Sequence, residues 1–117
     1  MNLMIDALQE FDTHTGLTHA NEDEGLYCEV LGMFHAQLKE QFATLPDQLS
    51  NNSYDSVARQ VHTLKGSATA LGATRLAATS AEIDSLLKSG EVPDRAMIEA
   101  LKIAVQATSQ DLAAAGF

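Results

Sequence analysis

The sequence has few of the features that mark a disulfide-linked, secreted or membrane-spanning protein. Its 117 residues include one cysteine, Cys28, which has no partner in the chain for a disulfide bond, and this fits a reducing compartment. No stretch approaches the roughly 20 apolar residues of a transmembrane helix. The first residues have neither a basic leader nor a continuous apolar run, so they predict no secretory signal. We therefore expect a cytoplasmic protein that has no contact with a membrane.

Positive charge is also scarce, with seven Lys and Arg residues against sixteen Asp and Glu and a net charge of -9. Nucleic-acid binding needs a basic surface that releases counterions, so nucleic acid is not an expected partner. Two prolines and an aromatic content of 5% favour helix over sheet. The length fits a single domain, which we expect to span residues 1–117.

Apolar residues recur at intervals of three and four, which is typical of amphipathic helices. Pro46 lacks the N–H that a continuing helix needs, so it is expected to kink or end the first long helix. Pro93 suits the first turn of the last one. Four long helices are predicted: from about Asn21 to Pro46, from Tyr54 to Leu71, from Ala73 to Lys88, and from Pro93 or Asp94 onward.

Before the long helices, residues 3–11 are expected to form a short amphipathic helix, and residues 14–20 a turn that can include one helical turn. Short connections between long helices make antiparallel neighbours. The predicted fold class is therefore all-α, an antiparallel up-and-down four-helix bundle with a short extra N-terminal helix. Its core is expected within about residues 22–115.

His62, Lys65 and Gly66 share one exposed stripe of the second long helix. Glycine inside a helix costs about 1 kcal/mol relative to alanine, so Gly66 indicates that something must come close to His62. A side chain that titrates near neutral pH, a neighbouring cation and a cleared approach predict a histidine that accepts a phosphoryl group. The buried stripe beside it is formed by Val57, Val61, Leu64, Ala68 and Leu71.

The segment from His62 to Gly72 resembles the signature of the histidine-containing phosphotransfer (HPt) domain family, His-x-Leu-Lys-Gly-Ser-x-x-x-Leu-Gly. The likeness extends over about residues 12–91. It implies a phosphorelay intermediate, in which Nε2 of His62 accepts a phosphoryl group from an aspartyl phosphate on a receiver domain and passes it to a second receiver. It further implies a monomer whose partners are response-regulator receivers and a hybrid sensor kinase. No cofactor or metal of its own is expected, since the receiver supplies Mg²⁺.

The resemblance assigns Lys65 as the cation near the phosphate. It assigns Gly66 as the residue whose missing side chain leaves room for the donor to approach His62. Asp84 falls where the family often has Glu or Gln, and a carboxylate there could accept the Nδ1 proton of His62 and leave Nε2 free. The alternative is a surface ion pair between Asp84 and Lys88, four residues apart on one helix. The two interpretations are equally favoured for Asp84, whereas the surface pair is preferred for Lys88.

The expected docking surface for the receiver comprises Ala58, Arg59, Thr63, Thr69 and Lys88. No glycine-rich nucleotide loop is present, so independent catalytic turnover is not expected. One alternative is a helical bundle that binds receivers and regulates signalling without phosphotransfer. Another is the phosphoacceptor part of a dimeric histidine kinase, but that would need a dimerisation hairpin and an ATP-binding domain, and the sequence shows neither.

Overall fold

The computed structural model of the chain describes residues 2–51 and 54–117. Within these ranges all regular structure is helical, apart from an isolated antiparallel bridge between Phe11 and Ala73. The all-α class predicted from the sequence is therefore confirmed. The helices are α1 (Leu3–Asp6), α2 (Thr13–His19), α3 (Glu24–Lys39), α4 (Leu45–Ser50), α5 (Tyr54–Leu71), α6 (Thr74–Lys88) and α7 (Arg95–Ala115).

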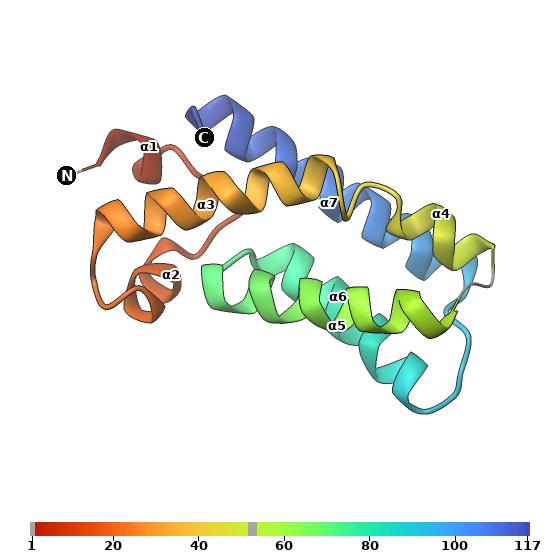
Figure 1. Cartoon of the computed structure of the whole chain (residues 1–117). Helices are drawn as coiled ribbons and strands as arrows, with labels where there is room; N and C mark the ends of the chain where they lie inside the picture. The colour runs from red at the N-terminus through yellow and green to blue at the C-terminus, as the bar shows by residue number, and fades with distance from the viewer. Residues whose placement is uncertain (1, 52–53) are drawn as a thin grey trace.

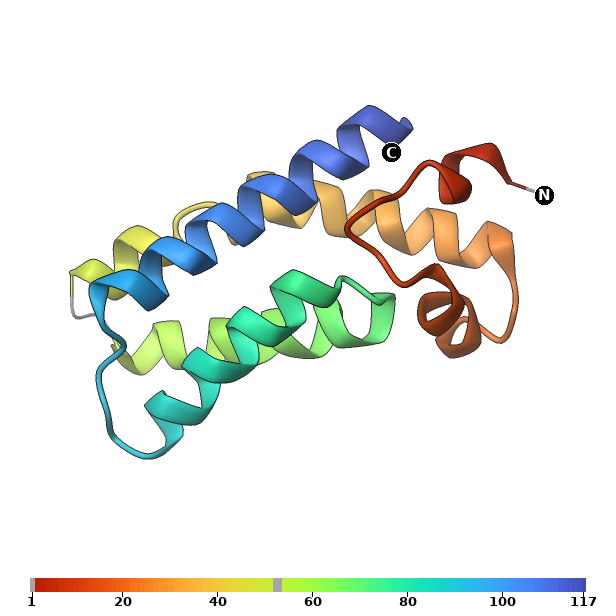
Figure 2. The same cartoon turned by 180° about the vertical axis from the view of Figure 1, so that it is seen from behind.

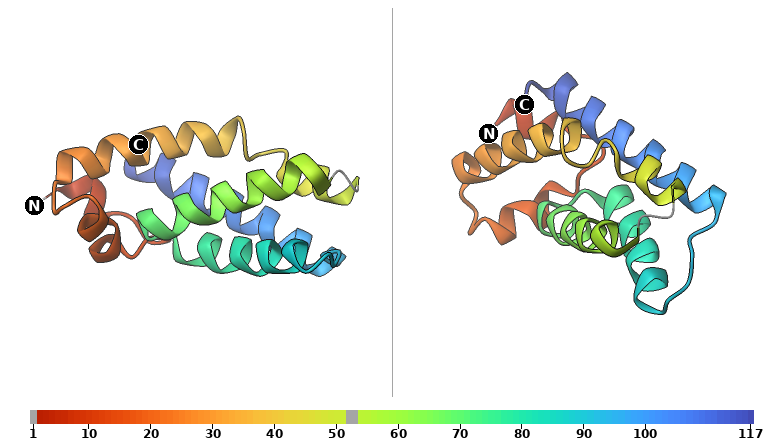
Figure 3. Two further views of the ribbon diagram at one scale, coloured as in Figure 1. Left: turned by 60° about the horizontal axis from the view of Figure 1, so that its bottom comes forward. Right: turned by 45° about the vertical axis from the view of Figure 1, so that its right-hand side comes forward.

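The long helices lie in two layers (Figures 1 and 2). One layer holds α3 and α7, and the other holds α5 and α6, which follow each other closely through a short turn at residues 72–73. In Figure 3 α5 and α6 again lie side by side along most of their length, with the chain reversing between them. Both termini lie at the end of the molecule where α3 begins.

One hydrophobic core fills the space between the layers. The stripe predicted for α5 is buried, which leaves the opposite face of this helix open to solvent. Burying a large apolar side chain stabilises the fold by about 1.5–3 kcal/mol, so this stripe fixes the rotation of α5 about its axis. The largest fully buried side chains are Tyr27, Leu31, Phe34, Leu38, Phe42, Leu45, Leu49, Leu64, Leu76, Ile83, Leu101 and Leu112.

The first long helix is shorter at both ends than the sequence predicted. Asn21 and Glu22 have φ angles of 56° and 61°, in the left-handed region that a right-handed helix excludes. α3 therefore begins after Asp23, whose carboxylate caps it, and it ends at Lys39. Pro46 does not end this helix but lies in the first turn of α4, where its missing N–H breaks no helical hydrogen bond.

The start of α7 also differs from the prediction. Asp94 is the N-cap, and its side chain accepts a hydrogen bond from the backbone N–H of Met97 at 2.8 Å. Pro93 is buried and precedes the cap, so it does not occupy the first turn. A carboxylate that satisfies a free N–H stabilises a helix start by about 1 kcal/mol, which explains why the helix begins at Arg95, after the cap, and not at Pro93 or Asp94.

The N-terminal region forms two short helices instead of one helix over residues 3–11. α1 ends at Asp6, and residues 14–20, predicted as a turn with at most one helical turn, fall largely within the seven-residue α2. Residues 9–12 are not helical: Gln9 and Glu10 form a bend and Phe11 forms the bridge to Ala73, and we call these four residues the N-terminal strap. The strap replaces the end of the helix predicted over residues 3–11, because its backbone groups bond to other parts of the fold.

The N-terminal strap crosses the turn between α5 and α6. The N–H of Asp12 donates to the carbonyl of Gly72 at 2.7 Å, and the N–H of Thr74 donates to the carbonyl of Glu10 at 3.2 Å. On α7, the carboxylate of Asp111 accepts hydrogen bonds from the N–H groups of the first two strap residues at 2.8–3.1 Å. These bonds tie the α5–α6 turn to the end of α7.

Candidate functional site

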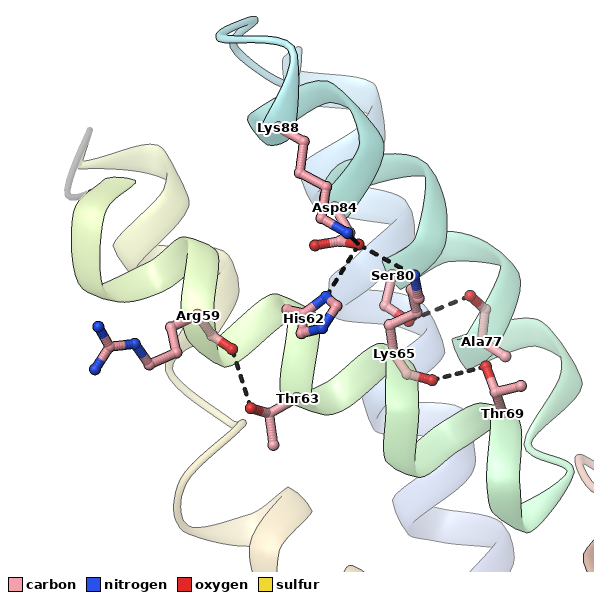
Figure 4. A network of polar contacts seen from close by, with 9 residues as sticks. All are labelled: Arg59, His62, Thr63, Lys65, Thr69, Ala77, Ser80, Asp84 and Lys88. Atoms are coloured by element: carbon pink, nitrogen blue, oxygen red, sulfur yellow. Dashed lines mark hydrogen bonds and ion pairs between the residues drawn. The ribbon is translucent and has the colours of Figure 1, made fainter. Parts of the chain in front are cut away.

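α5 presents His62 on its outer surface (Figure 4). The neighbouring Val61 and Leu64 are fully buried, whereas 59% of the His62 side chain is exposed. The ring turns its Nδ1 towards α6 and leaves Nε2 on the other side. A reactant from outside the bundle can therefore reach Nε2 without any opening of the fold.

Asp84 of α6 lies beside the His62 ring, and 5% of its side chain is exposed. Its Oδ2 is 3.4 Å from Nδ1 of His62, 3.2 Å from Nζ of Lys65 and 3.0 Å from Nζ of Lys88. Three nitrogen atoms from two helices thus converge on one oxygen (Figure 4). The contact to His62 is long for a hydrogen bond; a hydrogen on Nδ1 can donate to it, and a neutral ring then has Nε2 unprotonated.

The turn between α5 and α6 brings His62 and Asp84 level with each other although they are 22 residues apart. Gly72 in this turn has a φ of 84°, a conformation that glycine adopts without strain. A Cβ at Gly72 would also collide with the backbone oxygen of Asp12 in the N-terminal strap. Ser80, one turn before Asp84, is buried and donates its hydroxyl to the carbonyl of Leu76 at 2.6 Å, so its hydrogen bond stays within α6.

The charges around Asp84 determine its ionisation. Burial acts to raise the pKa of the carboxyl group, but hydrogen bonds from Lys88, His62 and Lys65 outweigh burial and hold the pKa below the ordinary value of 3.8. Asp84 is therefore ionised at neutral pH. Two ammonium groups against one carboxylate leave a local positive charge beside His62, on a chain whose net charge is -9.

Gly66 lies one turn after His62 and is exposed. A Cβ built at this position meets no atom within 4 Å, and the backbone there is helical. Neither packing nor backbone conformation in the described part of the chain therefore requires glycine. Glycine lowers the stability of the helix by about 1 kcal/mol relative to alanine, and no contact within the fold offsets this loss.

The other predicted surface residues share the outer side of α5 with His62. Ala58 is half-buried, while Arg59, Thr63 and Thr69 are exposed. The Thr63 hydroxyl donates to the carbonyl of Arg59 at 3.0 Å, and the Thr69 hydroxyl donates to the backbone carbonyl one turn before it at 2.7 Å. Figure 4 shows the Arg59 guanidinium pointing away from His62. The structure thus gathers two lysines around His62 but does not bring Arg59 to them.

The remaining histidines lie elsewhere. His14 and His19 are exposed on α2, and His35 is buried on α3 with its Nδ1 2.7 Å from the carbonyl oxygen of Phe117. Across residues 2–51 and 54–117, no group of three or more His, Cys, Asp or Glu side chains is placed to hold a metal ion. In the same ranges, no helix combines the length and apolar character that crossing a membrane requires.

The convergence on one oxygen is the feature that sequence reasoning missed. Lys88 was assigned mainly to a surface pair with Asp84, and the structure has this pair. The same Nζ, however, binds the oxygen that contacts His62. The available signal was the combination of two spacings, 22 residues from His62 to Asp84 across the turn and four from Asp84 to Lys88 along α6.

Comparison with known proteins identifies the family. The family model described as the Hpt domain matches residues 29–111, which include the whole of α5 and α6 and all four residues of the cluster around Asp84. No curated protein and no solved structure matches the chain. Hpt domains take part in two-component phosphorelays, as the motif beginning at His62 implied. Because the match spans most of the sequence, the chain belongs to the Hpt domain family.

Proposed function

We propose that this chain is a phosphorelay intermediate that accepts a phosphoryl group on Nε2 of His62 and passes it on. The donor is an aspartyl phosphate of a receiver domain. The lone pair of Nε2 forms a P–N bond as the P–O bond to that aspartate breaks, and the electron pair of the broken bond remains on the receiver's carboxylate. A second receiver reverses these steps with its own aspartate as the nucleophile. The Nδ1 proton stays on the ring throughout.

The observation that carries this proposal is the Asp84 oxygen shared by His62, Lys65 and Lys88. A carboxylate at Nδ1 favours the tautomer in which Nε2 is free to attack. Ammonium groups near the ring stabilise the negative charge on the phosphoryl oxygens during transfer. The open space at Gly66 supports a close approach of the donor.

The proposed partners are response-regulator receiver domains, with a hybrid sensor kinase as a source of phosphate. The receiver would supply Mg²⁺, so the chain would need no cofactor or metal of its own. It would act in the cytoplasm as a monomer without independent turnover. We take residues 1–117 as one domain in which α3, α5, α6 and α7 form the antiparallel up-and-down bundle.

The receiver would dock on the outer face of α5 and the adjoining edge of α6. The small side chains there obstruct little, and the two threonine hydroxyls bond to the helix backbone. Such a surface suits a complex that must release its partner quickly. Around His62 we assign Ala58, Arg59, Thr63, Thr69 and Lys88 to this docking surface.

A bundle that binds receivers without phosphotransfer is the alternative. It would use the same docking surface, but it would need neither an exposed nucleophile nor a cation beside it. His62, Lys65 and Gly66 are all present, with the His62 side chain 59% exposed and open space at Gly66. Transfer is therefore the better-supported function.

Incubation of the purified chain with a receiver carrying labelled phosphate tests the proposal. Label should reach the wild type and a His14→Gln control but not a His62→Gln variant. Because the His62 side chain is 59% exposed, the substitution should change the free energy of unfolding by less than about 0.5 kcal/mol. Loss of label would then report the chemistry and not the folding.

The stability of the label identifies the modified group. Phosphohistidine is labile in acid and stable in base, so the label should be lost at low pH. Labelled His62→Gln protein would contradict the assignment of the phosphoacceptor. A receiver that binds the wild type without transferring label would support the alternative function.

A further inference from the structure

The lysines of this site are engaged before any phosphoryl group arrives. Lys65 and Lys88 both lie within hydrogen-bond distance of Oδ2 of Asp84, at 3.2 and 3.0 Å. The three side chains differ in freedom, because 5% of Asp84 is exposed against 34% of Lys65 and 59% of Lys88. A fixed carboxylate thus holds two ammonium groups at the ends of flexible, solvent-exposed chains.

We propose that Oδ2 of Asp84 is an exchange point, which stores both ammonium groups and releases them to the phosphoryl group on His62. The inference rests on the proposed function, since it requires a phosphorylated His62. On phosphorylation, Lys65 and Lys88 move their hydrogen bonds from Oδ2 to phosphoryl oxygens. No covalent bond is made or broken in this exchange, and no proton is transferred. Asp84 retains the Nδ1–H of His62 as its partner.

The charges favour the exchange. A phosphoryl group carries about -1.5 to -2 charges and three strong acceptor oxygens, against one charge on the carboxylate. The ammonium groups therefore gain attraction by moving to it. The imidazole ring with phosphorus on Nε2 and hydrogen on Nδ1 is itself a cation, 3.4 Å from Oδ2 before the reaction. It takes the place of the lysines, so the buried Asp84 is not left without a positive partner, which would be costly.

The ion pairs of Asp84 in the unphosphorylated chain also favour release of the phosphoryl group over its retention. The Asp84 ion pairs must break when the phosphoryl group arrives and re-form when it leaves, so they oppose retention and favour onward transfer. An amide at position 84 would still accept the Nδ1–H but would attract the ammonium groups far less. Asp84→Asn weakens two ammonium contacts in the unphosphorylated chain and one contact to the ring cation in the phosphorylated chain. It should therefore raise the fraction of chain that carries phosphate at equilibrium with a phosphorylated receiver by roughly two- to tenfold, as expected for a difference of one ion pair that involves solvent-accessible ammonium groups.

The test follows the lysine side chains directly by NMR. The complete chain, with ¹⁵N-labelled lysine, is phosphorylated with phosphoramidate, a donor that needs no receiver. In the unphosphorylated chain, Asp84→Asn should shift the Nζ signals of Lys65 and Lys88 but not that of Lys102, which is exposed on α7. After phosphorylation the same substitution should leave all three signals nearly unshifted, because the lysines no longer bind residue 84.

Two control variants separate the exchange from other effects. Glu82→Gln removes an exposed charge from the same helix and should leave the lysine signals of both states unchanged. In His62→Gln, phosphoramidate should not alter the Lys65 or Lys88 signals. The exchange is overturned if these two lysines respond to Asp84→Asn as strongly after phosphorylation as before.

The outcomes for the two proposals differ. A chain that shows the exchange with phosphoramidate but takes no phosphate from any receiver contradicts the relay function and leaves the exchange standing. A chain that takes phosphate from a receiver, with Lys65 and Lys88 still bound to Asp84, keeps the relay function and refutes the exchange. If neither phosphoramidate nor a phosphorylated receiver modifies His62, both proposals fail.

Discussion

At the residue scale, packing inside the fold does not explain the glycine at position 66. Gly16 and Gly72 have internal reasons: a Cβ at Gly16 would collide with the ring of Tyr27, and Gly72 has a φ of 84° and contacts Asp12. Gly66 has open space around it and helical backbone. Gly32 on α3 also lies in open space, so the proposed reason for Gly66 rests on its place one turn after His62, where it would leave room for a docked partner.

Substitutions at Gly66 should separate folding from transfer. Gly66→Ala should stabilise the protein by up to about 1 kcal/mol in urea unfolding, because alanine favours the helix. Gly66→Gln should fold equally well but accept labelled phosphate from a receiver several-fold more slowly, since its side chain obstructs the approach to His62. Gly32→Gln is the matched control, because a Cβ at Gly32 on α3 also meets no atom within 4 Å. Transfer at the wild-type rate in Gly66→Gln would refute this reason for the glycine.

Asp84 should make stability depend on pH in the acid range. Its pKa in the folded chain lies below the ordinary value, so ionised Asp84 contributes stability above the unfolded pKa of about 3.9. This contribution falls as the pH drops below that value and is gone below the folded pKa. Urea unfolding from about pH 6 to about pH 2 should show a smaller loss of stability in Asp84→Asn than in the wild type or Glu82→Gln. Equal losses in all three would mean that the Asp84 contacts stabilise nothing.

At the scale of elements, the turn between α5 and α6 positions the site, and the N-terminal strap holds this turn. The hydroxyl of Tyr27 on α3 also donates to the carbonyl of Leu71 at 2.7 Å, at the end of α5. Backbone and side-chain bonds from two other parts of the chain, the N-terminal strap and α3, thus meet where α5 reverses into α6. The register that brings Asp84 level with His62 depends on this turn.

Removal of the Asp111 carboxylate tests the role of the strap. Asp111→Ala leaves two strap N–H groups without their acceptor, and it should lower the free energy of unfolding by about 1–2 kcal/mol. Hydrogen exchange at these two N–H groups should accelerate. The neighbouring Gln110→Ala, an exposed position on the same helix, should change neither quantity. Unchanged exchange in Asp111→Ala would show that the strap is held by other contacts.

The elements differ in how far the sequence predicted them. α5 has the predicted bounds because a single apolar stripe runs along it and Gly72 ends it. α3 was extended to Pro46 because Phe42 and Leu45 continue its apolar spacing, yet they enter the core from a loop and from α4. Periodicity reports burial and not helix continuity, so it could not reveal this break.

The N-terminal strap was not predictable for a related reason. Its bonds join residues separated by up to 102 positions, and local patterns carry no information about such pairs. The contact between His62 and Asp84 was within reach because one turn relates the two helices. The shared oxygen of Asp84 was not predicted, because it depends on the side-chain conformations of two lysines.

At the scale of the whole molecule, the core and the chemistry occupy different places. The apolar side chains fill the space between the two layers, while His62 faces outward from α5. Phosphate could therefore arrive and leave without opening the bundle. The chain has a net charge of -9 and seven Lys and Arg residues, and two of these, Lys65 and Lys88, lie beside His62. In the proposed relay, the bundle would hold one reactive side chain at its surface.

The most direct measurement is a ¹H–³¹P NMR correlation on the chain after phosphorylation by a receiver, because it identifies the nitrogen that carries phosphorus. The account predicts one phosphoryl group, coupled to the ring protons of His62 in the pattern of an Nε2 substituent. Addition of a second, unphosphorylated receiver should then remove the signal. Phosphorus on Nδ1 of His62, on His14 or His19, or on a carboxylate would contradict the central claim.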